Sequence, residues 1–139
     1  MSEWLIDKSA LVRLGRSADP IAWAERLERG LVRVCSATRL ELGYSARSAS
    51  DLKTIITTVP VSALTIEHFT PAVEERAIEI QRLLAERGLH RGPSLVDILI
   101  AATAELNRLV VLHVDPDFET ISELTGVRVE RLQLAAPAE

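Results

Sequence analysis

Short apolar segments alternate with helical patterns along almost the whole chain of 139 residues, and this alternation restricts the fold most strongly. The clearest apolar segment lies at 109–114, a nearly continuous aliphatic run that is typical of a central strand in a parallel sheet. The clearest helix lies at 71–87, where apolar residues recur at helical spacing before Gly88. Strands that alternate with helices predict an α/β fold of three layers, with helices on both faces of a central, mainly parallel sheet.

The same periodicities predict the other elements. A helical pattern after the first strand ends at Gly15, and the run at 59–64 contains Pro60, which favours an edge strand. We expect one domain over 1–134 and a flexible tail at 135–139. The strands are predicted at 4–6, 31–35, 59–64, 109–114 and 127–131, and the later helices at 20–29, 36–47, 51–58, 71–87, 95–107 and 116–124.

Composition narrows the functional classes. Sixteen Lys and Arg against 20 Asp and Glu give a net charge of −4, which argues against a general nucleic-acid coat protein and still allows local basic patches. A single cysteine, Cys35, excludes an intrachain disulfide and suits a reducing cytoplasm. The longest uncharged stretch, at 54–66, is too short to span a bilayer. We therefore expect a cytoplasmic protein with no membrane segment.

Four carboxylates lie where strands meet helices. Asp7 follows the first strand and Asp115 follows the strand at 109–114, while Glu41 and Asp97 lie near the starts of two helices. In an open parallel sheet, ligands bind beyond the carboxyl ends of the strands, so these four side chains are expected to converge there. Converging carboxylates repel one another unless a cation neutralises them, and hard oxygen ligands select Mg²⁺ or Mn²⁺.

Each acid also fits a purely structural role. Asp7 and Asp115 stand where a helix N-cap is expected, and Pro116 suits the first helical position after Asp115. Capping-box spacing joins Thr38 to Glu41 and Ser94 to Asp97. Capping and metal binding are compatible, so both interpretations stay open. His113, in an apolar strand, is expected to be a hydrogen-bonded histidine of the core or its rim.

Four segments carry a resemblance to a known family. Leu-Ile-Asp-Lys-Ser-Ala-Leu at 5–11 resembles the opening of a PIN-domain nuclease, and Leu-Glu-Leu at 40–42 is similar to its second acidic position. Pro-Ser-Leu-Val-Asp-Ile-Leu-Ile-Ala-Ala-Thr-Ala at 93–104 and Leu-His-Val-Asp-Pro-Asp-Phe at 112–118 resemble the third and fourth. The match in order and spacing extends over 5–132. Its length and the histidine before the last motif make the chain resemble VapC-type toxins of bacterial toxin–antitoxin pairs.

The resemblance implies a PIN-like fold and an endoribonuclease that depends on Mg²⁺ or Mn²⁺, cleaves cellular RNA, forms a homodimer and is inhibited by a VapB-type antitoxin. It implies that Asp7, Glu41, Asp97 and Asp115 are catalytic, and that Asp7, Asp97 and Asp115 bind the metal. Asp117 is then an auxiliary ligand or a supporting group, and Ser9 holds a carboxylate or a water. Basic residues that are candidates for binding RNA by their position are Lys8, Arg13, Arg39, Arg47 and Arg91.

Two other classes of function remain as alternatives. A metal-dependent phosphoryl-transfer domain also places acids at strand ends, but its haloacid-dehalogenase form needs Asp-x-Asp where this chain has Asp7-Lys8-Ser9. A non-catalytic α/β module that binds a partner is the second alternative. A nuclease assay with and without chelator separates these alternatives from the nuclease.

Overall fold

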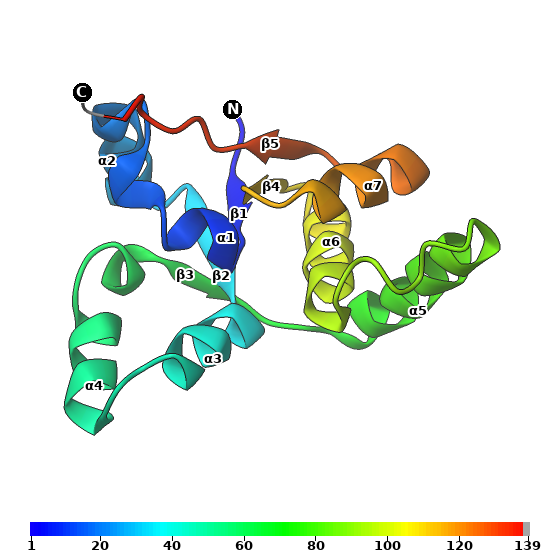
Figure 1. Ribbon diagram of the computed structural model, residues 1–139, viewed down its shortest axis with the longest axis horizontal. Coiled ribbons are helices and arrows are strands. Elements are labelled where there is room, and N and C mark those ends of the chain that lie inside the picture. Colours follow the sequence, from blue (N-terminus) through cyan, green and yellow to red (C-terminus); the bar gives the residue numbers. More distant parts are fainter. Residues whose placement is uncertain (138–139) are drawn as a thin grey trace.

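The computed structural model describes residues 1–137, and a sheet of five short strands forms its centre (Figure 1). The strands are β1 (Trp4–Ile6), β2 (Val32–Cys35), β3 (Thr65–Glu67), β4 (Val110–His113) and β5 (Val129–Arg131). They lie in the order β3-β2-β1-β4-β5, and every neighbouring pair is parallel. The predicted α/β class with a central parallel sheet is therefore confirmed.

Helices connect the strands, and several begin at caps that are visible in the sequence. Asp19, Thr70 and Asp115 each accept a backbone hydrogen bond at a helix start, and a proline follows each of them. Proline suits this position because the first helical N–H has no partner inside the helix. The α-helices are α1 (Lys8–Leu11), α2 (Pro20–Glu28), α3 (Ser36–Tyr44), α4 (Ala49–Thr57), α5 (Pro71–Glu86), α6 (Leu95–Asn107) and α7 (Pro116–Thr125).

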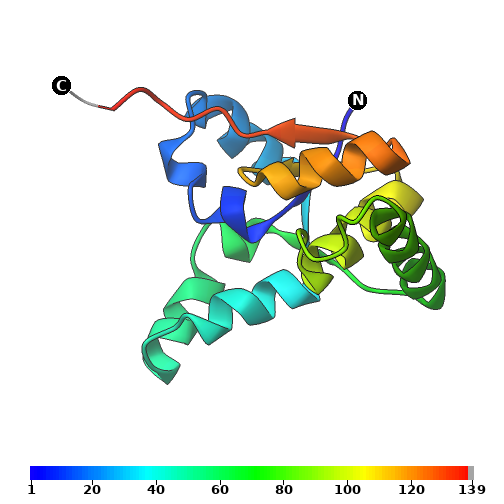
Figure 2. The same ribbon diagram turned by 45° about the vertical axis from the view of Figure 1, so that its right-hand side comes forward.

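The two faces of the sheet pack against different helices. Leu5 and Val111 belong to a buried cluster that includes the apolar sides of α5, α6 and α7. Their strand neighbours Trp4 and Val110 belong to a second cluster, together with residues of α1 and α2. Adjacent side chains of a strand point to opposite faces, so the two clusters define three layers. In Figures 1 and 2, α5 and α6 lie together on one side of the sheet, and α3 and α4 lie together away from them.

One predicted strand is misplaced. The apolar run expected as a strand at 59–64 forms a short 3-10 helix, Val61–Ala63, and the strand follows it as β3. Pro60 lacks the N–H that a strand ladder needs, and the side chain of Val61 is buried in the core. β3 does lie at an edge of the sheet, as the proline suggested.

The predicted tail at 135–139 lies partly outside the described residues, which end at 137. At its start, the Ala135 N–H donates to the carbonyl of Arg16 over 2.9 Å. Over residues 1–137, no helix is both long enough and apolar enough to cross a membrane.

The strand order reverses beside β1. From β1 the chain builds β2 and β3 on one side, and it later builds β4 and β5 on the other side. In open parallel sheets, such a switch point leaves a crevice at the carboxyl ends of the two strands that flank it. Asp7 follows β1 and Asp115 closely follows β4, so the fold brings both acids to this crevice.

Candidate active site

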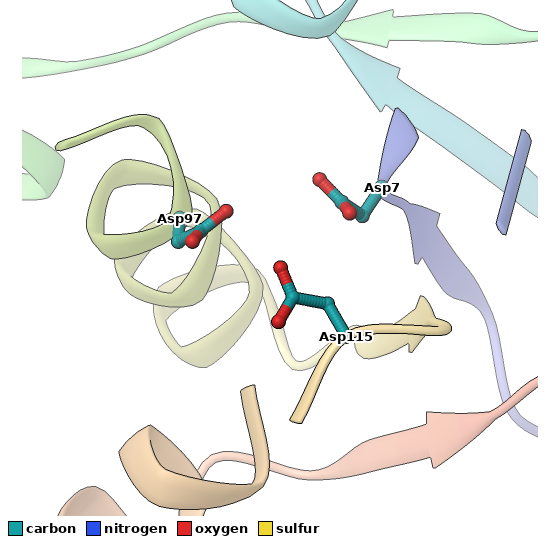
Figure 3. Close-up of side chains that lie close together, drawn as sticks. All are labelled: Asp7, Asp97 and Asp115. Atoms are coloured by element: carbon teal, nitrogen blue, oxygen red, sulfur yellow. The ribbon is translucent and has the colours of Figure 1, made fainter. Parts of the chain in front are cut away.

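Three aspartates from distant parts of the chain meet at the switch point. Asp7, Asp97 and Asp115 each offer a carboxylate oxygen, and these oxygens all lie within 4.8 Å of one another. Figure 3 shows the three carboxylates directed toward a common space, from the end of β1, the first turn of α6 and the segment after β4. Asp7 and Asp97 are buried, whereas Asp115 is partly exposed. The predicted convergence of these three acids is found in the structure.

Ser9 holds Asp7 and also joins two strand ends. Oδ2 of Asp7 accepts hydrogen bonds from the Ser9 backbone N–H at 3.1 Å and from the Ser9 hydroxyl at 2.7 Å. The same hydroxyl oxygen accepts the N–H of Val114 at 2.9 Å. Ser9 therefore links the segment after β1 to the segment after β4.

The other two aspartates also serve as helix caps. Asp97 and Ser94 form a complete capping box at the start of α6, with Oδ2 of Asp97 accepting the Ser94 N–H at 3.0 Å. Oδ1 of Asp115 accepts the N–H of Asp117 at 2.9 Å. Each cap bond goes to one of the two oxygens of its carboxylate, as it does in Asp7. Helix capping by these side chains therefore does not exclude metal binding by the same carboxylates.

Burial and repulsion by neighbouring carboxylates make the ionised form of Asp97 unfavourable. The pKa of Asp97 is raised from 3.8 to about 6, first because burial removes water from the carboxylate and further because Asp7 and Asp115 are negative. The hydrogen bonds with Ser94 act in the opposite direction and lower this pKa. A cation in the crevice would oppose both unfavourable effects, because it stabilises the ionised form.

Glu41 and Asp117 border the same cavity, which has a volume of about 540 Å³. Burial raises the pKa of both carboxyls, and the nearby charges of Asp7 and Asp115 raise those of Glu41 and Asp117 respectively. The predicted capping box of Thr38 and Glu41 is wrong. Helix α3 begins at Ser36 without a side-chain cap, so Glu41 lies in its second turn, where the helix directs it to the cavity.

Two of the five basic candidates border this cavity, Lys8 and Arg13. Both come from the segment after β1, and the Arg13 guanidinium is held by the backbone carbonyl of Ser9 at 2.8 Å. The other three lie elsewhere: Arg39 lines a separate, mainly apolar groove over α3 and α4, Arg47 lies in the turn between these helices, and Arg91 lies in the α5–α6 loop.

His113 makes a contact to the site that the sequence interpretation missed. The residue is fully buried at the end of β4, and its Nδ1 accepts the N–H of Asp115 at 3.1 Å. Burial lowers the pKa of the imidazole, and the nearby Arg131 lowers it further. The spacing of two residues between His113 and a strand-end acid was the available signal in the sequence.

The donor set fits a hard divalent cation. The cluster offers carboxylate oxygens alone, which Mg²⁺ and Mn²⁺ prefer over softer ligands. Asp7 and Asp115 add to the effect of burial in raising the pKa of Asp97, and a cation between the three carboxylates would relieve this repulsion. Asp7, Asp97 and Asp115 are therefore the residues suited to hold such an ion, with Asp117 beside them.

Comparison with known proteins assigns the family. A sequence model of the PIN domain family matches residues 4–124, a range that contains all five acids of the cavity. The chain belongs to the PIN domain family. Among PIN relatives, it is 54% identical to "Ribonuclease VapC2" of Mycobacterium tuberculosis (strain CDC 1551 / Oshkosh) over 135 residues, 97% of this chain and 96% of that protein. It is 41% identical to "Ribonuclease VapC51" of strain ATCC 25618 / H37Rv over 124 residues, 89% and 88% of the two chains. The resemblance to VapC-type proteins is thus confirmed.

Solved structures agree on the PIN fold at lower sequence identity. A chain of DNA-bound VapBC from Salmonella typhimurium superposes with a TM-score of 0.70 at 22% identity, covering 94% of this chain and 98% of the other. A chain of VapBC2 from Rickettsia felis, bound to a promoter DNA fragment, gives 0.74 at 14% identity with the same coverage. At these identities the likeness establishes the fold alone.

Proposed function

We propose that this PIN-domain chain is an endoribonuclease that depends on Mg²⁺ or Mn²⁺ and acts as the toxin of a toxin–antitoxin pair. The observation that carries the proposal is the convergence of Asp7, Asp97 and Asp115 at the switch point of the sheet. Relatives named ribonucleases support RNA as the substrate. The phosphoryl-transfer alternative gains no support, because the matching family is the PIN domain.

Asp7, Asp97 and Asp115 would hold the cation, and Asp117 would support it from the start of α7. When bound, the ion would supply Lewis-acid chemistry, which stabilises negative charge at the attacked phosphate and makes water more acidic. Hydrogen bonds at the helix caps already hold all three carboxylates, so they would need little reorganisation to hold a cation.

The remaining cavity residues act on the RNA and on water. Lys8 and Arg13 offer positive charge on one wall of the cavity and would bind phosphates that flank the cleaved bond. Glu41 lies outside the group of three ligands, and its raised pKa suits it to take the proton that an attacking water loses. The proposed catalytic set is therefore Asp7, Glu41, Asp97 and Asp115.

The same proposal includes partners. Similar solved structures come from VapBC complexes, which supports a VapB-type antitoxin as the partner of this chain. We further propose a homodimer and a cytoplasmic location, where the RNA substrate is present. Free expression should then slow growth, and co-expression with the antitoxin should relieve the effect. A chain that is harmless at detectable levels would contradict the toxin assignment.

A cleavage assay tests the enzymatic part. The purified chain should cleave a structured RNA with Mn²⁺ or Mg²⁺ and stop when EDTA is added. Asp97→Asn should remove most of the activity without unfolding the chain, because an asparagine oxygen can still accept the Ser94 N–H. The matched control is Glu123→Gln, which removes one charge from an exposed position on α7. Full activity in EDTA would contradict the proposed mechanism.

A further inference from the structure

The turn between β4 and α7 carries Asp115, and side chains hold its backbone amides. The Val114 N–H donates to the Ser9 hydroxyl at 2.9 Å, and the Asp115 N–H donates to Nδ1 of His113 at 3.1 Å. Pro116 has no N–H, and the next two amides donate to oxygens of Asp115 itself. Every donor of this turn therefore has a named acceptor, and His113 is the acceptor for the residue that carries the metal-binding carboxylate.

Within residues 1–137, a histidine at position 113 leaves a buried polar atom unpaired, which an apolar side chain would not do. The ring is fully buried, and it packs against Phe118 with ring centroids 5.4 Å apart. Because Nδ1 accepts a hydrogen bond, the proton of the neutral ring lies on Nε2. This Nε2 is buried and has no hydrogen-bond partner among the described residues. An unpaired buried donor is unfavourable, so packing alone does not account for a histidine here.

We infer that His113 is a positioning residue that orients Asp115 toward the other two metal-binding aspartates. The inference rests on the proposed function. The hydrogen bond from the Asp115 N–H fixes this residue in extended backbone, with φ −138° and ψ 118°, immediately before α7. Without the acceptor, the Asp115 N–H is left unpaired, and we expect the backbone to turn toward another acceptor and to move the carboxylate within the 4.8 Å cluster. Groups that form hydrogen bonds with metal ligands and orient them play a similar role, and their loss typically lowers metal affinity or activity about 10- to 100-fold.

A matched pair of variants isolates the acceptor. His113→Asn and His113→Leu both give side chains that branch at Cγ. Leucine nearly keeps the volume of the ring and asparagine is smaller, but only asparagine keeps an oxygen near the position of Nδ1. Mn²⁺ affinity is measured by calorimetry on metal-free protein, and kcat and KM are measured for RNA cleavage. We expect His113→Leu to weaken Mn²⁺ binding about 10- to 100-fold and to lower kcat at fixed Mn²⁺, with KM for RNA unchanged. His113→Asn should stay close to the wild type in both measurements.

The outcomes separate a positioning role from a structural one. Equal Mn²⁺ affinity in both variants and the wild type would overturn the inference, even if His113→Leu melts at a lower temperature. Should the leucine variant not fold, ¹⁵N NMR of the wild-type imidazole decides: a proton on Nε2 with Nδ1 as acceptor supports the inference, and a proton on Nδ1 overturns it. Cleavage by the wild type that ignores chelator would instead overturn the proposed function. Metal-dependent wild-type cleavage with an unaffected leucine variant overturns the positioning role alone.

Discussion

Asp97→Asn should stabilise the metal-free protein while it removes most of the cleavage activity. The pKa of Asp97 rises from 3.8 to about 6 in the folded chain, a difference that corresponds to about 3 kcal/mol at 1.36 kcal/mol for each pKa unit. Asparagine removes the buried charge and keeps an oxygen for the Ser94 N–H, so the helix cap survives. We expect the free energy of unfolding to increase by up to about 3 kcal/mol at pH 7.5, which raises the melting temperature by about 10 °C in a domain of this size.

The gain in stability from Asp97→Asn should depend on pH. Above pH 6 the wild-type Asp97 is ionised in both states, and the full cost of its burial weakens the fold. Below pH 3.8 it is protonated in both states, and the cost disappears. Between these values the folded state binds more protons than the unfolded state, so wild-type stability falls as pH rises. The advantage of Asp97→Asn should therefore shrink as the pH falls from 6 toward 3.8.

Thermal and urea unfolding in EDTA, followed by circular dichroism over this pH range, measure the effect. Glu123→Gln removes a charge of the same sign from an exposed site and should change stability little at any pH. Lower stability of Asp97→Asn at pH 7.5, or a gain that does not depend on pH, would refute the electrostatic reasoning and leave Asp97 as a structural cap.

Three further predictions concern the same cavity. Mn²⁺ should raise the melting temperature of the wild type, because at a free Mn²⁺ concentration of 100 times the dissociation constant it adds about 2.7 kcal/mol to the free energy of unfolding. The shift for Asp97→Asn should be much smaller, and no shift of the wild type at millimolar Mn²⁺ would argue against a metal site. Asp115→Ala should reduce cleavage more than Asp117→Ala at saturating Mn²⁺, because only Asp115 belongs to the 4.8 Å cluster, and the reverse ranking in an initial-rate assay would exchange their roles. Ser9→Ala removes the hydroxyl that joins Asp7 to the amide of Val114, so the Mn²⁺ affinity measured by calorimetry should fall by about tenfold or more. An unchanged affinity would show that the backbone alone orients Asp7.

The sequence predicted the parts of the fold that depend on continuous apolar segments. Strands β1, β2 and β4 are buried on both faces, so their residues form unbroken apolar runs or nearly so. Strand β3 is a half-exposed edge of three residues, Thr65–Glu67, and leaves no such pattern. The apolar run before it forms a 3-10 helix instead, and Val61 packs in the core without joining the sheet.

The candidate site was predictable for the same topological reason. Asp7 and Asp115 follow central strands, and parallel strands bring their carboxyl ends to one edge. The positions of the basic side chains were harder to predict. The rotation of each helix about its axis decides whether a side chain such as Arg39 faces the cavity or a neighbouring groove. The contact of His113 depends on the ring orientation as well as on its spacing from Asp115, and the spacing alone does not give the orientation.

The pairing of β1 with β4 has a consequence for how the chain is made. On the ribosome, the segment with Asp7 emerges before its two partners, since Asp97 and Asp115 follow it by 90 and 108 residues. The central strand β1 likewise stays without its β4 neighbour until residues 110–113 have left the exit tunnel. A shorter nascent chain therefore carries no assembled acidic centre. For a chain proposed to cleave RNA, the proposed metal site can form only after both partner segments have emerged.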